Sequence, residues 1–490
     1  MTQAILPEHL KRFELYTRRI RKFRFPSGEG LNFSVSPHVY LAIAKSRGMQ
    51  PITSLTELFI PEAGLLAQFP GIFLLSSQTL NSVYLYRVGD GEPVVTSLLH
   101  DISSKECNIQ RMGICGKLTS KFLDTLSTFK YLDSVHIVNG NLHLTTEEFL
   151  RPFSCLKTLK NLQFTFVEDS KSTFSKNQRG GKPLGFIFST LKILTVMGSA
   201  LNIATILHSM FPPELVDVRV IITSMEGTPM AVELCTKIIR SWKAPHLRAL
   251  QFISDDRGEL YTDYYVLSYQ MIGQSRQGPL GCPIPSNGLS HISQLHCPLE
   301  SVHLEIDPYF LNPSIVHIFE KSFTSLKRLE LRSSISTSVE SWSPTETENL
   351  MRLSEMDIFA SHFPNLEVLI ICTVFELEEM KEMKQKSENQ DIGGHNLQEL
   401  VLLPFPHHAD SLFAPITSIM DAFGVARYLD HLFPTMTTLD LSECVKINTL
   451  WRQAVLDMVE EFQEVRRIAN SRSLIVQGAR PGSSLNSAVA

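Results

Sequence analysis

A six-residue phrase, Leu-x-x-Leu-x-Leu, constrains the fold of this chain more than any other feature. It reads LKRLEL at 326–331, and similar phrases read LRALQF, LEVLII and LQELVL. Because successive side chains of a β-strand point to opposite faces, the fourth and sixth positions share one face, and Arg328 and Glu330 lie on the other. The phrase therefore predicts a short strand with one apolar face and one polar face.

A count decides whether the phrase is a repeat. With Ile, Val, Met or Phe allowed in place of Leu, it begins at Ile20, Leu55, Leu80, Ile109, Leu132, Leu159, Leu191, Leu215, Leu247, Leu299, Leu326, Leu366, Leu397 and Met436. Roughly sixteen such matches are expected by chance, so this loose form is weak evidence. Leu at both the first and fourth positions occurs at Leu55, Leu159, Leu191, Leu247, Leu326, Leu366 and Leu397. Roughly two or three of these stricter matches are expected by chance, so they indicate a repeat.

The residues before the phrase predict a helix. A Phe lies three residues before the first position at Phe129, Phe323, Phe363 and Phe433, at the end of an amphipathic stretch, and Phe211 is a variant followed by two prolines. A Phe in the last helical turn can anchor the helix on a sheet, and Pro cannot continue the helix. The repeating unit is therefore predicted to be a helix, a stop and a short strand.

One such unit cannot fold alone. Its three to five buried aliphatic side chains supply roughly 5–15 kcal/mol, whereas ordering its residues costs roughly 1.5 kcal/mol for each of about 25 residues. Stacking the units in a parallel sheet removes this deficit, which is the principle of a solenoid. The spacing of the phrases is irregular, and the excess residues predict insertions at 167–190, 253–298, 332–350 and 376–395.

Three segments resemble the F-box/leucine-rich-repeat proteins, especially their irregular fungal members. LDLSECVKI at 439–447 is similar to the cysteine-containing repeat of that family, with Cys444 at the position of its turn-bonding Cys or Asn. HLKRFELYTRRIRKFRF at 9–25 resembles the segment that follows the F-box, and 448–470 resembles the closing helix. The resemblance implies an irregular α/β leucine-rich-repeat solenoid with a parallel concave sheet, convex helices and a C-terminal capping helix.

The F-box itself is expected to be absent from this chain. ILPEHL at 5–10 imitates the opening of an F-box, but KRFELYTRRIRKF leads directly into the repeats. The expected organisation is an N-terminal helical segment at 1–19, the solenoid with its four insertions at 20–447, a capping helix at 448–470 and a disordered tail at 471–490.

Composition limits the partners. The formal net charge is −5 and the Lys and Arg residues are scattered, so no nucleic-acid partner is expected. The N-terminus has no apolar signal segment, and the longest apolar stretch, at 368–375, is too short to cross a bilayer. We therefore expect no membrane association and a cytoplasmic or nuclear location. The eight cysteines form no C-x-x-C pair, which favours reduced, buried thiols.

No catalytic motif accompanies the repeats. The loop NQRGGKP at 177–183 lacks the pattern of a phosphate-binding loop. His407 and His408 are adjacent, so their side chains diverge and no third ligand is evident, and the acidic cluster at 255–263 lacks the spacing of a calcium loop. We expect no enzyme activity, catalytic residue, cofactor or metal site.

The expected functional surface is the polar face of the strands. Its candidate partner-binding residues are His136, Gln251, His303, Lys327, Arg328, Glu330, Glu367, Gln398 and Glu399. The expected function is protein recognition, and by resemblance the capture of a protein substrate for an F-box-type ubiquitin ligase, with the ligase adaptor bound only if an F-box is supplied. The alternatives are a scaffold or sensor that binds a regulatory protein without a link to ubiquitin, and, remotely, a hydrolase with its site in 253–298.

Overall fold

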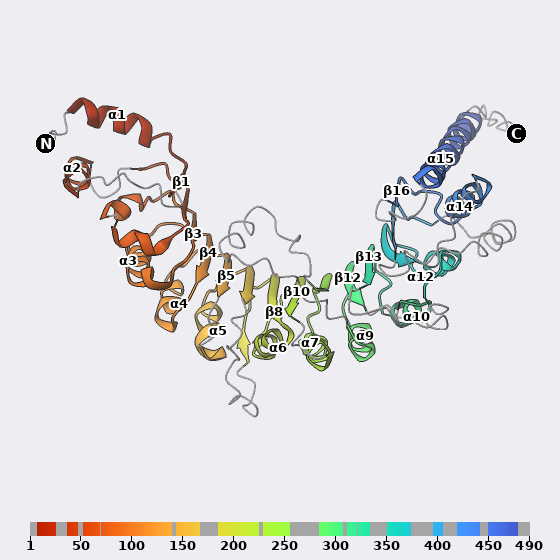
Figure 1. The fold of residues 1–490 in the computed structure, drawn as a ribbon, viewed down its shortest axis with the longest axis horizontal. Helices are drawn as coiled ribbons and strands as arrows, with labels where there is room; N and C mark the ends of the chain where they lie inside the picture. The colour runs from red at the N-terminus through yellow and green to blue at the C-terminus, as the bar shows by residue number, and fades with distance from the viewer. Residues whose placement is uncertain are drawn as a thin grey trace, which may run out of the picture. The chain divides into compact units, whose positions relative to one another are not determined.

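The protein is an α/β protein built on one 14-stranded parallel sheet, with helices between the strands (Figure 1). The computed structural model describes residues 7–25, 37–47, 52–68, 70–139, 144–166, 185–224, 229–254, 284–306, 311–320, 322–333, 350–373, 395–404, 419–441 and 449–478. The strands of this sheet follow one another in chain order, and the chain divides into two compact units, Met1–Leu299 and Glu300–Ala490.

The first unit contributes nine strands to this sheet. They are β1 (Lys22–Arg24), β2 (Glu57–Ile60), β3 (Ser82–Leu85), β4 (Arg111–Gly116), β5 (Ser134–Asn139), β6 (Asn161–Phe166), β8 (Ile193–Ser199), β10 (Asp217–Ser224) and β11 (Ala249–Ser254). Its helices are α1 (Pro7–Thr17), α2 (Pro37–Arg47), α3 (Glu92–Ser104), α4 (Ser120–Leu126), α5 (Thr146–Ser154), α6 (Ala200–His208), α7 (Pro229–Ser241) and α9 (Ser286–Ser293). From α3 onward they lie side by side along one face of the sheet (Figure 1).

The second unit contributes five strands. They are β12 (Ser301–Ile306), β13 (Arg328–Ser333), β14 (Val368–Thr373), β15 (Glu399–Pro404) and β16 (Thr438–Asp440). Its helices are α10 (Ser314–Glu320), α12 (Asp357–His362), α14 (Ile419–Leu432) and α15 (Thr449–Gly478), of which α14 and α15 pack closely together.

Every one of the fourteen phrases coincides with a strand of the large sheet. Each strand begins two residues after the first position of its phrase, as Leu55 precedes β2 and Leu326 precedes β13. The fourth and sixth positions are buried in twelve consecutive phrases, from Leu58 and Ile60 to Leu400 and Leu402. The predicted alternation of the strands and the parallel sheet are therefore confirmed, including the phrases that only the loose pattern found.

The second position of the phrase joins neighbouring strands within each of the two units. Its backbone carbonyl accepts hydrogen bonds from two N–H groups, those of the second and third positions of the following phrase. The Thr56 carbonyl accepts from Asn81 and Ser82 at 3.0 and 3.1 Å, and the Glu300 carbonyl accepts from Lys327 and Arg328 at 2.9 Å. These bonds satisfy turn N–H groups that would otherwise lose their partners on burial, and they fix the register in which each strand starts.

Threonine side chains reinforce several of these junctions. At the position just before the phrase, the hydroxyls of Thr79, Thr158, Thr190 and Thr435 donate to the carbonyl of the first position of the preceding phrase, at 2.8–3.1 Å. The hydroxyl of Thr158 also lies 3.2 Å from the Lys130 carbonyl. This recurrent Thr is a sequence signal that the leucine pattern alone does not include.

The predicted Phe anchors are buried, with one exception. Phe129, Phe323, Phe363 and Phe433 are buried, although each lies in the turn just after its helix rather than in the last helical turn. The N–H groups of Leu326, Leu366 and Met436 donate back to the carbonyls of the last three of these residues. Phe211 is 43% exposed and lies in β9 (Met210–Phe211), which pairs with β7 (Phe186–Ile187). The prediction for Phe211 is therefore wrong, because strand pairing outside the core takes the place of a buried turn.

Two predicted irregular segments contain regular structure. The expected insertion at 253–298 includes α9, because Leu289 and Ile292 are spaced for one helix face and are buried. Helix α15 ends at Gly478 rather than at 470, since no Gly or Pro interrupts the chain between these positions. Cys444 and most of the four insertions, namely 167–184, 255–283, 334–349 and 376–394, lie outside the described residues.

Because the fourth side chain of each phrase is buried, we expect its truncation to lower the free energy of unfolding strongly. Leu329 is fully buried on β13, so Leu329→Ala is expected to lower the free energy of unfolding by about 2–5 kcal/mol. Exposed Lys327, two residues earlier, is the control, and Lys327→Ala is expected to change it by about 0.5 kcal/mol or less. Chemical denaturation measures both, and equal effects would contradict the burial of the fourth position in the core.

The threonine junction predicts a smaller, specific effect. Thr158→Val keeps the shape of the side chain but removes the hydroxyl that bridges two carbonyls, and we expect it to lower the free energy of unfolding by about 1 kcal/mol or more. Thr205→Val is the matched control, because the Thr205 hydroxyl bonds only within its own helix, to the Leu201 carbonyl. A loss no greater than that of the control would show that the bridge contributes nothing.

Candidate protein-binding surface

The polar face of β12 and β13 gathers three of the predicted residues. The two strands pair in parallel, with His303 opposite Glu330 and Ser301 opposite Arg328. Their fourth and sixth side chains, Val302, Leu304, Leu329 and Leu331, are buried on the opposite face. Alternation therefore directs His303, Arg328 and Glu330 to one common surface.

Glu330 lies at the centre of this surface and is itself buried. Its side chain is 7% exposed, and its Oε1 accepts a hydrogen bond of 2.7 Å from Nε of Arg332. Its Oε2 lies 3.5 Å from a terminal nitrogen of Arg328, and its Oε1 lies 3.3 Å from Nε2 of His303. The prediction that Glu330 is solvent-exposed is wrong, because the side chains on either side fold over it.

The two arginines remain accessible above the buried carboxylate. Their side chains are 43% and 44% exposed, and Arg332 contacts Glu330 through Nε. Glu305 lies opposite Arg332 in the strand register, so the surface carries acidic as well as basic groups. Guanidinium groups held in this way present fixed hydrogen-bond donors to carboxylate or carbonyl oxygens. We call Arg328, Glu330 and Arg332 the arginine clamp.

His303 is electrically neutral at neutral pH. Burial lowers the pKa of His303 to about 4, with Arg332 and Arg328 acting in the same direction, while Glu330 opposes the shift. The buried carboxylate is therefore balanced by the two arginines rather than by an imidazolium.

The other predicted residues are not part of the clamp. His136 is on β5, where burial lowers its pKa to about 4, and Gln251 is on β11 beside Arg219 of β10. Glu399 is half-buried on β15. Three further residues occupy the second position of their phrases, namely Lys327, Glu367 and Gln398. They lie in the turn before each strand, because pairing in the sheet starts only at the third position. The prediction that these last three lie on the strand face is wrong.

Arg332 is the residue of the arginine clamp that the sequence reasoning missed. It follows the six-residue phrase and falls outside its boundary, although β13 continues to Ser333. The alternation of Arg328, Glu330 and Arg332 in the sequence was the available signal, since residues at i, i+2 and i+4 share one face of a strand.

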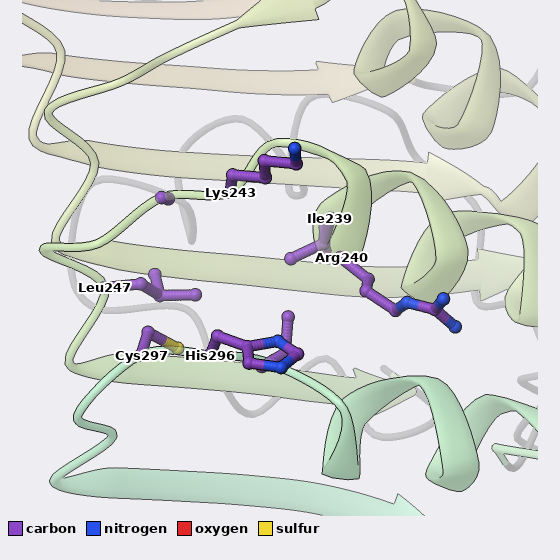
Figure 2. A pocket seen from close by; sticks show the side chains of 8 residues that line it. Ile239, Arg240, Lys243, Leu247, His296 and Cys297 are labelled. Carbon is purple, nitrogen blue, oxygen red and sulfur yellow. The ribbon is translucent and has the colours of Figure 1, made fainter.

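A pocket in the first unit is a weaker candidate for a functional site than the arginine clamp. It lies between the end of α7 and the segment after α9, has a volume of about 230 Å³, and is lined by Ile239, Arg240, Lys243, Ala244, Leu247, Leu295, His296 and Cys297 (Figure 2). Figure 2 shows the Arg240 and Lys243 heads pointing apart, and Arg240 is engaged with Nδ1 of His291 at 3.0 Å. Burial raises the pKa of Cys297 to about 11, which keeps this thiol protonated and weakly nucleophilic.

One group of side chains in the described part of the chain has the composition of a metal site. His317, Glu320 and His362 come from α10 and α12, and their potential ligand atoms all lie within 4.8 Å of one another. The prediction that no metal site exists rested on sequence motifs, and the separation of His362 from the other two residues hides this group from such motifs.

Comparison with known proteins adds no family to these observations. No model of a protein family matches the sequence, and no curated protein matches it either. Across the described residues, none of the helices combines the length and the apolar character needed to span a bilayer. The residues 177–183, His407, His408 and the acidic cluster at 255–263 lie outside the described part.

The buried, neutral His303 predicts a pH dependence of stability. Since its pKa is about 4 in the folded chain and about 6.5 when unfolded, the unfolded state binds the extra proton between these values. Stability is therefore fully present above pH 6.5 and falls as the pH drops towards 4, by about 3 kcal/mol for this residue.

His303→Gln removes this titration and should flatten the loss of stability between pH 6.5 and 4. Chemical denaturation across that range measures the slope, and His246→Gln is the control because the His246 side chain is exposed. An identical slope in the wild-type chain and His303→Gln would contradict a buried, neutral His303.

Proposed function

We propose that this chain is a non-enzymatic protein-recognition module, an irregular leucine-rich-repeat solenoid that binds a protein through the arginine clamp. The observation that carries the proposal is the placement of Arg328 and Arg332 over the buried carboxylate of Glu330. The concave shape of the sheet and the convex position of the helices belong to this proposal.

Preorganisation is the physical argument for binding. A free arginine side chain loses rotational freedom when it meets a partner, and that loss weakens binding. Here the 2.7 Å bond from Nε of Arg332 to Glu330 holds the guanidinium before any partner arrives. Arginine is also among the residues that contribute most at protein interfaces. A rigid strand pair with two such groups is therefore a suitable centre for an interface.

The choice of a protein as ligand rests on the form of the surface. The two guanidinium side chains of the clamp are 43% and 44% exposed, whereas small-molecule sites are enclosed clefts. The neighbouring strand β14 carries Val368, half-buried, and Ile370, buried, on the same face as Arg328 and Glu330. Apolar side chains next to fixed polar donors are the usual mixture of a protein interface.

A role in ubiquitin ligation is supported by the resemblance at 9–25, 439–447 and 448–470. In this reading the bound protein is a substrate, and an F-box from sequence outside 1–490 supplies contact with the ligase adaptor. The alternative is a scaffold or sensor with the same recognition surface and no ligase. No observation supports a hydrolase in 253–298. The Cys297 thiol is held protonated, and residues 255–283 lie outside the described part.

Replacement of the whole clamp tests the recognition surface. Arg328→Gln, Glu330→Gln and Arg332→Gln, made together, remove both guanidinium groups without leaving a buried charge unpaired. Affinity purification from the native cells, with quantitative mass spectrometry, should show specific partners that the triple variant loses by about tenfold or more. Arg151→Gln, on helix α5, is the control and should retain them. Equal recovery by the triple variant would exclude the clamp as the interface.

The fate of the partner separates the two functions. If the chain recruits substrates for a ligase, depletion of the chain should lengthen the half-life of the partner, and the partner should carry less ubiquitin. If the partner binds the clamp but its half-life and its ubiquitin content are unchanged, the scaffold or sensor reading holds and the ligase reading fails.

A further inference from the structure

We propose that His317, Glu320 and His362 form a binding site for a divalent transition-metal ion, with Zn²⁺ as the best-matched ion. The three side chains project from α10 and α12, two helices that pack together within the second unit (Figure 1). This site is separate from the arginine clamp, which lies on the strands, and nothing in the proposed recognition function requires it.

The spacing of the ligand atoms suits a single ion. Nδ1 of His317 lies 3.6 Å from Oε2 of Glu320, and Nε2 of His362 lies 3.5 Å from the same oxygen. Zinc binds nitrogen and oxygen at about 2.0–2.2 Å, so neighbouring ligands of a tetrahedral ion stand about 3.3–3.6 Å apart. Two of the three separations thus match already, and the third, within 4.8 Å, closes with a small rotation of the exposed His317 side chain.

The tautomer of His362 is already the one that a metal needs. Its Nδ1–H donates a hydrogen bond of 2.8 Å to the Ile358 carbonyl in the preceding turn of α12. In the neutral ring this leaves the lone pair on Nε2, the atom that faces Glu320. Metal-binding histidines almost always donate their other N–H to such a carbonyl or carboxylate, which fixes the ring.

The surroundings of Glu320 also favour a cation. Among the described residues, its only ion-pair partners are the two histidines, and no Lys or Arg forms an ion pair with its carboxylate. The two imidazole rings lie with centroids 5.2 Å apart at 80° to each other, and each has a nitrogen within 3.6 Å of Oε2 of Glu320. A carboxylate that meets two imidazoles and no fixed positive charge has the ligand types that bind a metal cation.

The fold explains how the three residues meet. His317 and Glu320 are three residues apart on α10, which places them on one helix face. His362 is the last residue of α12, the helix of the following repeat. Stacking of the repeats brings the two helix faces together, so a site assembled from one residue pair and one distant histidine is a product of the repeat itself.

The ligand types select the ion. Imidazole binds Zn²⁺, Cu²⁺ and Ni²⁺ well, whereas Mg²⁺ and Ca²⁺ prefer sites made of oxygen. Two histidines and one carboxylate leave a fourth position of a tetrahedral ion for water or for a side chain of another molecule. The His317 side chain is 62% exposed, so this fourth position lies towards solvent. A bound ion would link α10 to α12 and stabilise the folded second unit.

Zinc titration of the full chain tests the site. We expect the reduced wild-type chain to bind Zn²⁺ at one site that His317→Ala weakens by roughly tenfold or more and that the pair His317→Ala, His362→Gln abolishes. Isothermal titration calorimetry gives the affinity and the number of ions. All variants keep the eight cysteines, so any zinc held by thiolates is common to all of them and cancels in the comparison.

Two controls make the result decisive. His246→Ala removes an exposed histidine that faces only Glu214, at 3.9 Å, and should leave Zn²⁺ binding unchanged. Thermal melts should show that zinc raises the melting temperature of the wild-type chain but not that of the double variant, while both melt alike in a chelator. Equal zinc binding by the wild-type chain and the double variant, or loss of binding in His246→Ala as well, would overturn the proposal and leave the histidines as ordinary ion-pair partners of Glu320.

Discussion

The junction between neighbouring phrases is the interaction on which the rest of the structure depends. Within each of the two units, the carbonyl of the second position accepts hydrogen bonds from two N–H groups of the next repeat, and the fourth and sixth side chains of neighbouring strands are buried. The hydrogen bonds fix where each strand begins, and the apolar side chains supply the free energy. Because every repeat is completed by its neighbour, stability belongs to the stack and not to the single unit.

This arrangement separates two kinds of surface. The strand face presents short, rigid and alternating side chains, and there the arginine clamp forms around Glu330 of β13. The helix side brings together residues of successive helices, and there His317 and Glu320 of α10 meet His362 of α12. The same repeat therefore offers a hydrogen-bonding surface on one side and a candidate metal site on the other, and neither requires an enclosed pocket.

The strands of the large sheet could be predicted from the sequence because alternation of Leu-type residues reports directly on burial. Even the phrases that chance could have produced, such as those at Ile109 and Leu132, precede strands β4 and β5. The surface was less predictable. The burial of Glu330 depends on how Arg328 and Arg332 fold over it, and the group at Glu320 depends on contacts between residues more than forty positions apart. Local alternation places the three clamp residues on one strand face but does not show that Glu330 is buried, and no local pattern joins His362 to Glu320.

Hydrogen exchange of the backbone amides at the second and third positions of the phrases tests the central claim most directly. If stacking holds the repeats together, amides such as those of Asn81, Ser82, Gln110 and Arg111 should exchange slowly, since each donates to a carbonyl of the preceding repeat. They should be protected together with the buried strands that follow them. Exchange of these amides as rapid as that of exposed turns, while the adjacent strands stay protected, would contradict the account.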